Sequence, residues 1–313
     1  MIINTGMRTD IPAFYTPWFL NRLRERFVLV RNPYRPEQVT RYRLSPDVVD
    51  LIGFCTKDPE PLLPHLDALE PYGQYWFVTI TPYGRDIEPG VPPVERVLES
   101  FRQLSDQVGA DRVGWRYDPI FLSDKYTLDF HRRAFAKMAE ALAGYTHACV
   151  ISFIDLYPKV TRNFPEALPV GREDRLALGQ YMIQTARANG MVLRPCGEGS
   201  ELAPYGADCG GCMTLGILEK ALGEGIRAPK QRGARKACSC HITCDIGAYD
   251  TCAHLCRYCY ANTSREAVLQ NRQRHDSRSP LLIGHLQPGD QLRQAHQESW
   301  RDRQGSPEWL RAA

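Results

Sequence analysis

Three cysteines in the segment CAHLCRYCYAN, residues 252–262, have the spacing C-x3-C-x2-C. They are Cys252, Cys256 and Cys259. Thiolates are the usual ligands of iron–sulfur clusters, and a cubane cluster has four irons, so three local cysteines leave one iron open. An open metal position is where a substrate can bind. The spacing therefore predicts a reactive 4Fe–4S cluster.

A second group of cysteines precedes this segment. Cys209 and Cys212 form a C-x2-C unit, and Cys238 and Cys240 form a C-x-C pair. Tetrahedral thiolate sites suit zinc as well as iron–sulfur clusters. We expect four thiols to bind a second iron–sulfur cluster or a zinc ion: Cys196, Cys212, Cys238 and Cys240. In the alternative, these thiols are unligated and one of them donates hydrogen to a product radical.

The chain has eleven cysteines in 313 residues, and six of them lie between Cys238 and Cys259. Its first residues lack the basic and apolar regions of a signal peptide. The sequence contains no run of about 18 apolar residues, so no membrane span is predicted. We therefore expect a cytoplasmic protein, in which cysteines more often serve metal binding or catalysis than disulfides. Cys55 and Cys149 stand alone in apolar runs and are expected to be small core residues.

Hydrophobic residues make up 43% of the chain and charged residues 24%, which is ordinary for a soluble globular protein. The net charge of +3 is uneven: residues 227–313 hold 14 Lys and Arg against 8 Asp and Glu, or +6, and residues 1–226 carry −3. A mildly basic C-terminal part is compatible with the phosphates of a nucleic acid or nucleotide. A solvated surface explains a charge of this density as well.

The first 200 residues alternate short apolar runs with amphipathic segments. The apolar runs predict six strands that are buried on both faces: residues 2–8, 49–56, 75–81, 112–118, 149–155 and 191–198. Residues 94–108 and 173–189 have helical patterns, and Gly190 follows the second. Six β-α units in series predict an α/β fold with a parallel sheet, and we expect a partial (β/α)6 TIM-type barrel over residues 1–226.

Polar residues stand at the carboxyl ends of these strands, where a β/α barrel carries its active site. They are Arg8, Asp10, Lys57, Asp58, Tyr83, Arg85, Arg116, Asp118, Asp155 and Glu198. We expect Arg8, Asp10, Arg116 and Asp118 to be catalytic, and Asp155 and Glu198 to bind a cofactor. Residues 227–262 contain few apolar side chains and cannot bury a core of their own. We therefore expect residues 227–313 to form a cysteine-rich extension that caps the barrel mouth.

The cysteine segment and its flanks resemble known families. TCAHLCRYCYAN is similar to the cluster loop of radical S-adenosylmethionine enzymes, C-x3-C-x-aromatic-C, with Tyr258 in the aromatic place. His254, Tyr260 and Ala261 also match the spore photoproduct lyase branch of these enzymes. More broadly, the chain resembles an uncharacterised bacterial family with a radical-SAM-like cysteine cluster near its C-terminus. Three stretches support this resemblance: MRTDIPAFYTPWF, CSCHITCDIGAYDTCAHLCRYCYAN and SPLLIGHLQPGDQLRQAHQESW.

The resemblance implies that Cys252, Cys256 and Cys259 hold three irons of a 4Fe–4S cluster whose open iron binds S-adenosylmethionine. Reduction would then give a 5′-deoxyadenosyl radical, and Tyr258 is expected to belong to the cofactor site. An electron donor such as flavodoxin or ferredoxin is implied, together with a nucleic-acid or nucleobase substrate. A small metabolite bound by the arginine and aspartate side chains at the mouth is the other substrate candidate.

Two other functions remain open at this point. One is an iron–sulfur or zinc protein of electron transfer or redox sensing. The other is a zinc-stabilised nucleic-acid-binding protein that uses the basic C-terminal part with Trp300 and Trp309. The first alternative arises because the cysteine segment follows most of the chain, whereas radical S-adenosylmethionine enzymes usually carry it after the first strand.

Overall fold

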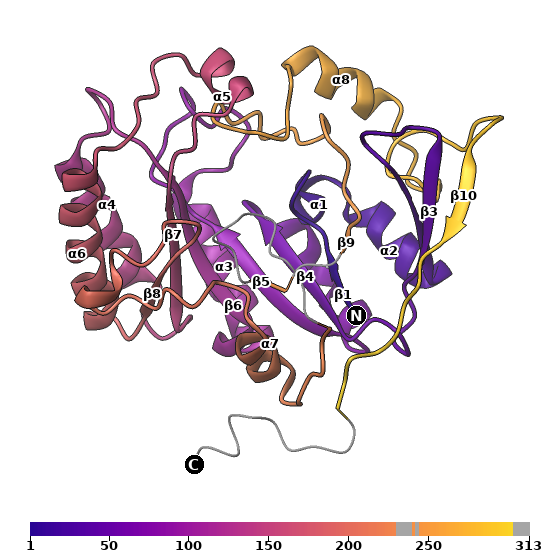
Figure 1. Cartoon of the computed structure of the whole chain (residues 1–313), viewed down its shortest axis with the longest axis horizontal. Coiled ribbons are helices and arrows are strands. Elements are labelled where there is room, and N and C mark those ends of the chain that lie inside the picture. Colours follow the sequence, from indigo (N-terminus) through magenta and orange to yellow (C-terminus); the bar gives the residue numbers. More distant parts are fainter. Residues whose placement is uncertain (230–239, 242–243, 303–313) are drawn as a thin grey trace.

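The computed structural model describes residues 1–229, 240–241 and 244–302. A seven-stranded parallel sheet lies at its centre, in the order β8-β7-β6-β5-β4-β1-β9 (Figure 1). The strands are β1 (Ile2–Asn4), β4 (Leu51–Thr56), β5 (Gly73–Thr79), β6 (Val113–Ile120), β7 (Ala148–Phe153), β8 (Val192–Pro195) and β9 (Cys244–Asp245). All six strands predicted from the apolar runs are present, and β9 beside β1 was not predicted.

From β1 to β8, each strand of this sheet lies next to the one before it, so the sheet winds in one direction. This confirms an α/β fold with a parallel sheet. Strands β8 and β9 are the two edges, and no hydrogen-bonded pairing joins them within the residues that the structure describes. The carboxyl ends of all seven strands therefore face the same edge, because parallel strands share one direction.

The sheet is rich in aromatic and branched side chains because both of its faces are covered. Trp76 and Trp115 are fully buried, and the rings of Phe54 and Trp76 stack with centroids 3.8 Å apart. Cys149 is buried in β7, as predicted, and Cys55 in β4 is half-buried. These packed strands form a rigid base for the loops that follow them.

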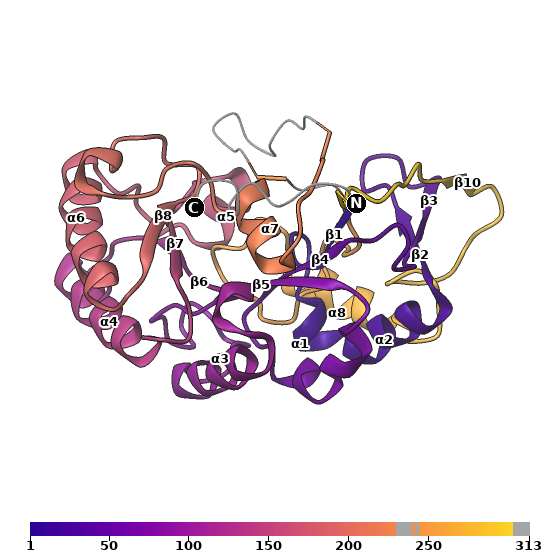
Figure 2. The ribbon, with the colours of Figure 1, turned by 90° about the horizontal axis from the view of Figure 1, so that it is seen from below.

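Helices follow the strands along the chain. They are α1 (Ile11–Phe14), α2 (Thr16–Glu25), α3 (Val94–Val108), α4 (Leu128–Ala141), α5 (Pro158–Asn163), α6 (Arg172–Ala188), α7 (Leu215–Leu222) and α8 (Arg265–Gln273). Helix α3 matches its predicted range and buries Val97, Phe101 and Leu104 on one face. Helices α4 and α6 lie side by side next to β7 and β8 (Figure 2). None of the helices in the described residues combines the length and apolar character needed to cross a membrane.

Short 3-10 helices complete the main body: η1 (Glu60–Leu69), η2 (Ala110–Arg112) and η3 (Ala203–Tyr205). A second, three-stranded sheet has the order β10-β3-β2, with β2 (Phe27–Arg31), β3 (Gln38–Arg43) and β10 (Gln291–Gln294). Strands β2 and β3 are antiparallel, and β10 pairs parallel with β3 (Figure 1). Two strands from the C-terminal part of the chain therefore pair with strands from the N-terminal part: β9 pairs with β1, and β10 pairs with β3.

Candidate functional site

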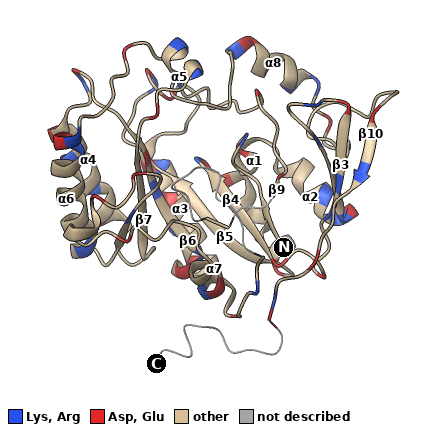
Figure 3. Ribbon diagram, viewed as in Figure 1, with Lys and Arg blue, Asp and Glu red and all other residues tan. Residues whose placement is uncertain are grey.

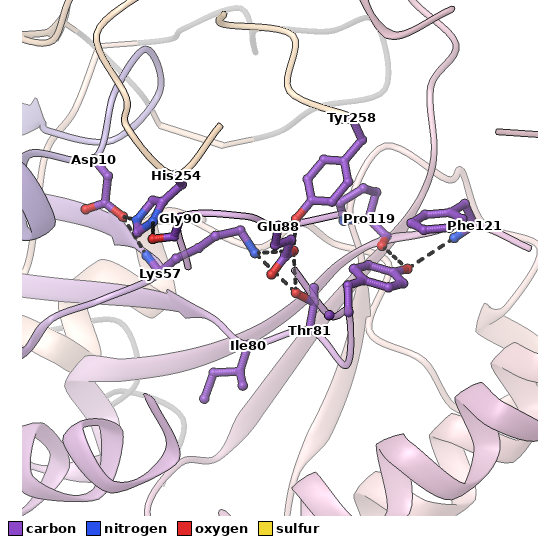
Figure 4. Close-up of polar contacts among 12 residues, drawn as sticks. Asp10, Lys57, Ile80, Thr81, Glu88, Gly90, Pro119, Phe121, His254 and Tyr258 are labelled. Carbon is purple, nitrogen blue, oxygen red and sulfur yellow. Dashed lines mark hydrogen bonds and ion pairs between the residues drawn. The ribbon is translucent and has the colours of Figure 1, made fainter. Parts of the chain in front are cut away.

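The cysteine loop, residues 252–262, is fastened near the carboxyl edge of the parallel sheet, and His254 is one of its anchors (Figure 4). His254 Nε2 lies 2.8 Å from Asp10 Oδ2, and Nδ1 lies 3.1 Å from the carbonyl oxygen of Gly90. Each ring nitrogen therefore faces an oxygen atom, so the imidazole is held from both sides. The Gly90 amide donates to the His254 carbonyl at 2.9 Å. Gly90 permits this approach, since a Cβ there would stand 2.3 Å from the Ala253 carbonyl oxygen.

Asp10 connects this anchor to the ends of β1 and β4. It follows β1 and caps α1, and its Oδ1 accepts from the Ala13 amide at 3.1 Å and the Thr56 hydroxyl at 2.7 Å. Its Oδ2 accepts from the Lys57 amide at 2.7 Å as well as facing His254. The carboxylate is only 5% exposed. A catalytic role was predicted for Asp10, and in the structure its carboxylate is in contact with four neighbouring groups.

The second anchor is built around Glu88, which is 3% exposed. Its Oε1 accepts from Lys57 Nζ at 2.9 Å, from the Thr81 hydroxyl at 2.6 Å and from the Tyr258 hydroxyl (Figure 4). Burial alone would lower the pKa of Lys57, but the Glu88 carboxylate raises it above its ordinary value, so Lys57 is an ammonium group. Burial, followed by Glu88, raises the pKa of Tyr258 well above its usual range, so the phenol keeps its proton.

Further contacts hold the rest of the cysteine loop. The Arg257 amide donates to the Ile87 carbonyl at 3.0 Å, beside Glu88 in sequence. The Tyr260 hydroxyl donates to the Met7 carbonyl at 2.5 Å, just beyond β1. The loop is therefore tied to the segments that follow β1 and β5, although it lies more than 160 positions away from each of them in sequence.

The three thiols of the loop, on Cys252, Cys256 and Cys259, are half-buried. Burial raises the pKa of each thiol above its ordinary value, so all three are protonated in the absence of a ligand. The Cys259 amide donates to the Cys256 carbonyl at 3.0 Å, and this turn fixes the spacing of these two residues.

The second group of thiols is partly assembled. Cys212 Sγ lies 3.8 Å from Cys196 Sγ and 3.3 Å from Cys240 Sγ. These residues come from the end of β8, the segment before α7 and the segment before β9. Cys238, the fourth predicted ligand, lies outside the described residues. In residues 1–229, 240–241 and 244–302, no three His, Cys, Asp or Glu side chains converge closely enough to hold a metal ion.

Ion pairs follow the same edge of the sheet. Arg8 Nε lies 3.1 Å from Asp245 Oδ1, which joins the ends of β1 and β9. Arg116 pairs with Asp118 on β6, and Ser152 of β7 donates to Asp118. The predicted residues Arg8, Arg116 and Asp118 are therefore all at the expected edge, each in a fixed contact with a neighbour.

The two predicted cofactor residues differ in their surroundings. Glu198, after β8, accepts from the Phe153 amide at 2.9 Å and lies 3.7 Å from Arg175. Burial raises the pKa of Glu198. Asp155, after β7, is exposed and accepts from the Tyr157 hydroxyl at 3.1 Å. Both are at carboxyl ends of strands, and only Glu198 is held against the backbone of a neighbouring strand.

Sequence reasoning did not identify Glu88, Thr81 or Asp245 as parts of this site. Glu88 precedes a Pro-Gly pair that contacts the cysteine loop, but such pairs mark many turns and carry no information about a contact 170 positions away. Asp245 lies in the two-residue strand β9, which has no apolar run to reveal it. Contacts between distant segments bring these residues into the site, and no local sequence pattern predicts such contacts.

Trp300 does not offer an exposed ring on which a nucleic-acid base could stack. Trp300 is only 7% exposed, and its amide donates to Asp50 Oδ2 at 2.7 Å, so its ring is part of the core. Trp309 lies outside the described residues. Helix α8 carries both signs of charge, with Glu266 beside Arg265 and with Arg272 near its end (Figure 3). These observations remove the support that Trp300 gave to the zinc-stabilised nucleic-acid-binding alternative.

Comparison with known proteins places this site within a family. No curated protein matched the chain. The model of a family described as a domain of unknown function (DUF1848) matches residues 2–261. This range includes the whole parallel sheet and all three cysteines of the loop. The chain therefore belongs to the DUF1848 family.

Proposed function

We propose that the protein is a radical S-adenosylmethionine enzyme, in which Cys252, Cys256 and Cys259 hold three irons of a 4Fe–4S cluster. The observation that carries the proposal is the anchoring of the cysteine loop at the carboxyl edge of the sheet through His254 and Tyr258. Active sites of β/α barrels are built at that edge. The single winding direction of the sheet, with β9 beside β1, supports a partial barrel whose mouth the loop would cover.

The donor set fits such a cluster. A single ion needs its ligand atoms around one point, whereas each thiolate of a cubane binds a separate iron, so the thiolates stand further apart. Cys252, Cys256 and Cys259 are three half-buried thiols in one loop, which is the number of local ligands that the proposed cluster needs.

Two buried polar atoms next to the anchors also favour a bound group. Thr9 Oγ1 and Asn262 Oδ1 have no hydrogen-bond partner within the described residues. Thr9 precedes Asp10, and the Asn262 amide nitrogen donates to the Cys252 carbonyl at 2.8 Å, so both atoms flank the loop. Buried polar atoms are normally hydrogen-bonded. A ligand with polar groups would satisfy them.

When bound and reduced, the cluster with S-adenosylmethionine would supply a 5′-deoxyadenosyl radical that abstracts hydrogen from the substrate. The protein's own residues would orient the ligands and exclude water. In the proposal the loop, held by Asp10 and Glu88, closes one side of the site. Tyr258, Asp155 and Glu198 are assigned to the polar groups of the cofactor. Arg8, Arg116 and Asp118 are assigned to the substrate.

Two substrate classes fit this assignment, namely a nucleotide or nucleic acid and a small polar metabolite. Arg8 and Arg116 offer fixed N–H donors, which suit the phosphate of the first class or the carboxylate of the second. The reaction also needs a one-electron donor, for which flavodoxin or ferredoxin is the proposed partner.

Release of 5′-deoxyadenosine tests the proposal. Protein purified and reduced without oxygen is incubated with S-adenosylmethionine, and the product is quantified by chromatography and mass spectrometry. We expect release from the wild-type protein and from Cys209→Ala, which replaces a half-buried cysteine that is not an assigned ligand. Cys256→Ala should release none. A wild-type protein with an intact cluster and no 5′-deoxyadenosine would refute radical chemistry.

A metal protein without radical chemistry is the second candidate, favoured by the contacts of Cys212 with Cys196 and Cys240. In this proposal Cys196, Cys212 and Cys240 bind one zinc ion or a second iron–sulfur cluster, and Cys238 is the fourth ligand. Cys212→Ala should then lose this metal and keep the cluster of the loop. Unchanged metal content in Cys212→Ala would refute the second site. A redox-active cluster without affinity for S-adenosylmethionine would favour electron transfer or redox sensing.

A further inference from the structure

Lys57 is a buried cation beside the cysteine loop, and the proposed radical chemistry gives it no role. It follows β4, and its side chain is only 12% exposed. Nζ lies 2.9 Å from Glu88 Oε1 and 3.2 Å from Thr81 Oγ1. The same nitrogen is 5.7 Å from the centroid of the Tyr258 ring, which belongs to the loop (Figure 4).

Lys57 is held by hydrogen bonds at both its backbone amide and its side-chain ammonium group. The Lys57 amide donates to the Asp10 oxygen that also faces His254, so the backbone of Lys57 and the loop share one carboxylate. The ammonium group shares Glu88 Oε1 with the Tyr258 hydroxyl. Lys57 and the loop are therefore held by the same two carboxylates, those of Asp10 and Glu88.

A buried ammonium group needs compensating negative charge. Glu88 supplies one charge, and it also binds the hydroxyl of Tyr258, which stands between Cys256 and Cys259 in sequence. Three thiolates on a cluster would bring further negative charge into the same poorly hydrated region. In such a region a fixed cation acts more strongly than in water, because the effective dielectric constant is lower.

We propose that Lys57 is the charge-balancing residue of the cysteine loop, and that its ammonium group stabilises the negative charge that the cluster gains on one-electron reduction. This inference rests on the proposed function, because it presupposes the cluster. The reduction adds one electron from the external donor and forms no new bond. Glu88 and Tyr258 act as positioning residues, since they hold the cation against the loop without touching the reacting atoms.

The midpoint reduction potential of the cluster measures this effect. Lys57→Met removes the charge and keeps an unbranched apolar stem, and we expect a more negative potential, because the reduced state loses its nearby cation. Glu88→Gln removes the opposing charge and keeps an oxygen that can accept from Thr81 and Tyr258. We expect a more positive potential for Glu88→Gln.

Lys125→Met is the matched control. Lys125 pairs with Asp86 at 2.9 Å, two residues before Glu88, but its side chain is 61% exposed. Water and salt screen an exposed charge, so this variant should keep the wild-type potential. Lys57→Arg retains the positive charge and should also keep a potential close to that of the wild type.

Iron and sulfide are measured in every variant before an anaerobic redox titration followed by electron paramagnetic resonance. Opposite shifts in Lys57→Met and Glu88→Gln, without a shift in Lys125→Met, support the role of Lys57. An unchanged potential in Lys57→Met with full iron content overturns this role and leaves the proposed cluster intact. Loss of the cluster from both Lys57→Met and Lys57→Arg would mean that the packing of the Lys57 side chain, and not its charge, supports the cluster. This result also overturns the charge-balancing role of Lys57. A wild-type protein without iron overturns the cluster and this inference together.

Discussion

The contact between Asp10 and His254 is predicted to fasten the cysteine loop to the sheet, and a double-mutant cycle measures its strength. Asp10→Asn keeps the size of the side chain and removes its charge. His254→Phe keeps the ring, which packs edge-on against Phe14 at 4.6 Å, and removes both ring nitrogens. The Nε2–Oδ2 distance of 2.8 Å between a buried imidazole and a buried carboxylate describes a charge-assisted hydrogen bond.

The magnitude follows from these contacts. Hydrogen bonds to charged groups contribute about 1.5–3 kcal/mol, and we expect an interaction energy of this size between the two substitutions. His254→Phe alone should lower the free energy of unfolding by about 2–4 kcal/mol, because it also removes the 3.1 Å contact with the Gly90 carbonyl.

Urea unfolding of the wild type, the two single variants and the double variant gives the interaction energy. Hydrogen exchange of residues 251–262 shows whether the loss is local to the loop, where faster exchange is expected in either variant. Additive effects, with an interaction energy below about 0.5 kcal/mol, would refute the anchoring role of this pair.

Two further predictions concern the acid range and the backbone under the loop. Burial lowers the pKa of His131 from 6.5 to about 4, so between these values the unfolded chain binds a proton that the folded protein excludes. His131 should therefore remove about 3 kcal/mol of stability as the pH falls through this window, and His131→Gln should show a weaker pH dependence in urea unfolding. Gly90→Ala brings a methyl group 2.3 Å from the Ala253 carbonyl oxygen and should destabilise the fold by about 1–3 kcal/mol in the same assay. Gly216→Ala in α7 meets no atom within 4 Å and should leave stability unchanged or raise it; equal losses in both variants would argue against the close approach at Gly90.

The parallel sheet could be predicted because each of its long strands forms an apolar run that is recognisable in the sequence. The run around Trp76 and the run around Cys149 are apolar on both faces, and only a strand covered on both sides explains them. Strand β9 was missed because two residues, Cys244 and Asp245, make no apolar run. The β2–β3 hairpin was missed because it interrupts the β-α alternation on which the prediction rested.

The candidate site was predictable only in part, for a different physical reason. Spacing within the loop identifies its cysteines, and the strand ends identify Arg8 and Arg116 as edge residues. Spacing cannot show that Glu88 meets Tyr258, because that contact is made by folding two distant segments together. Nor can it show that the carboxylate of Asp10, for which a catalytic role was predicted from its place after the first strand, is in contact with four neighbouring groups.

The central claim is that the loop cysteines hold an iron–sulfur cluster, and elemental analysis tests it most directly. Iron and acid-labile sulfide per chain are measured in anaerobically purified wild-type protein and in a variant with Cys252, Cys256 and Cys259 all replaced by alanine. The account predicts that the variant loses about four irons and about four sulfides per chain, the content of one cubane cluster. Equal iron and sulfide in the two proteins would contradict it.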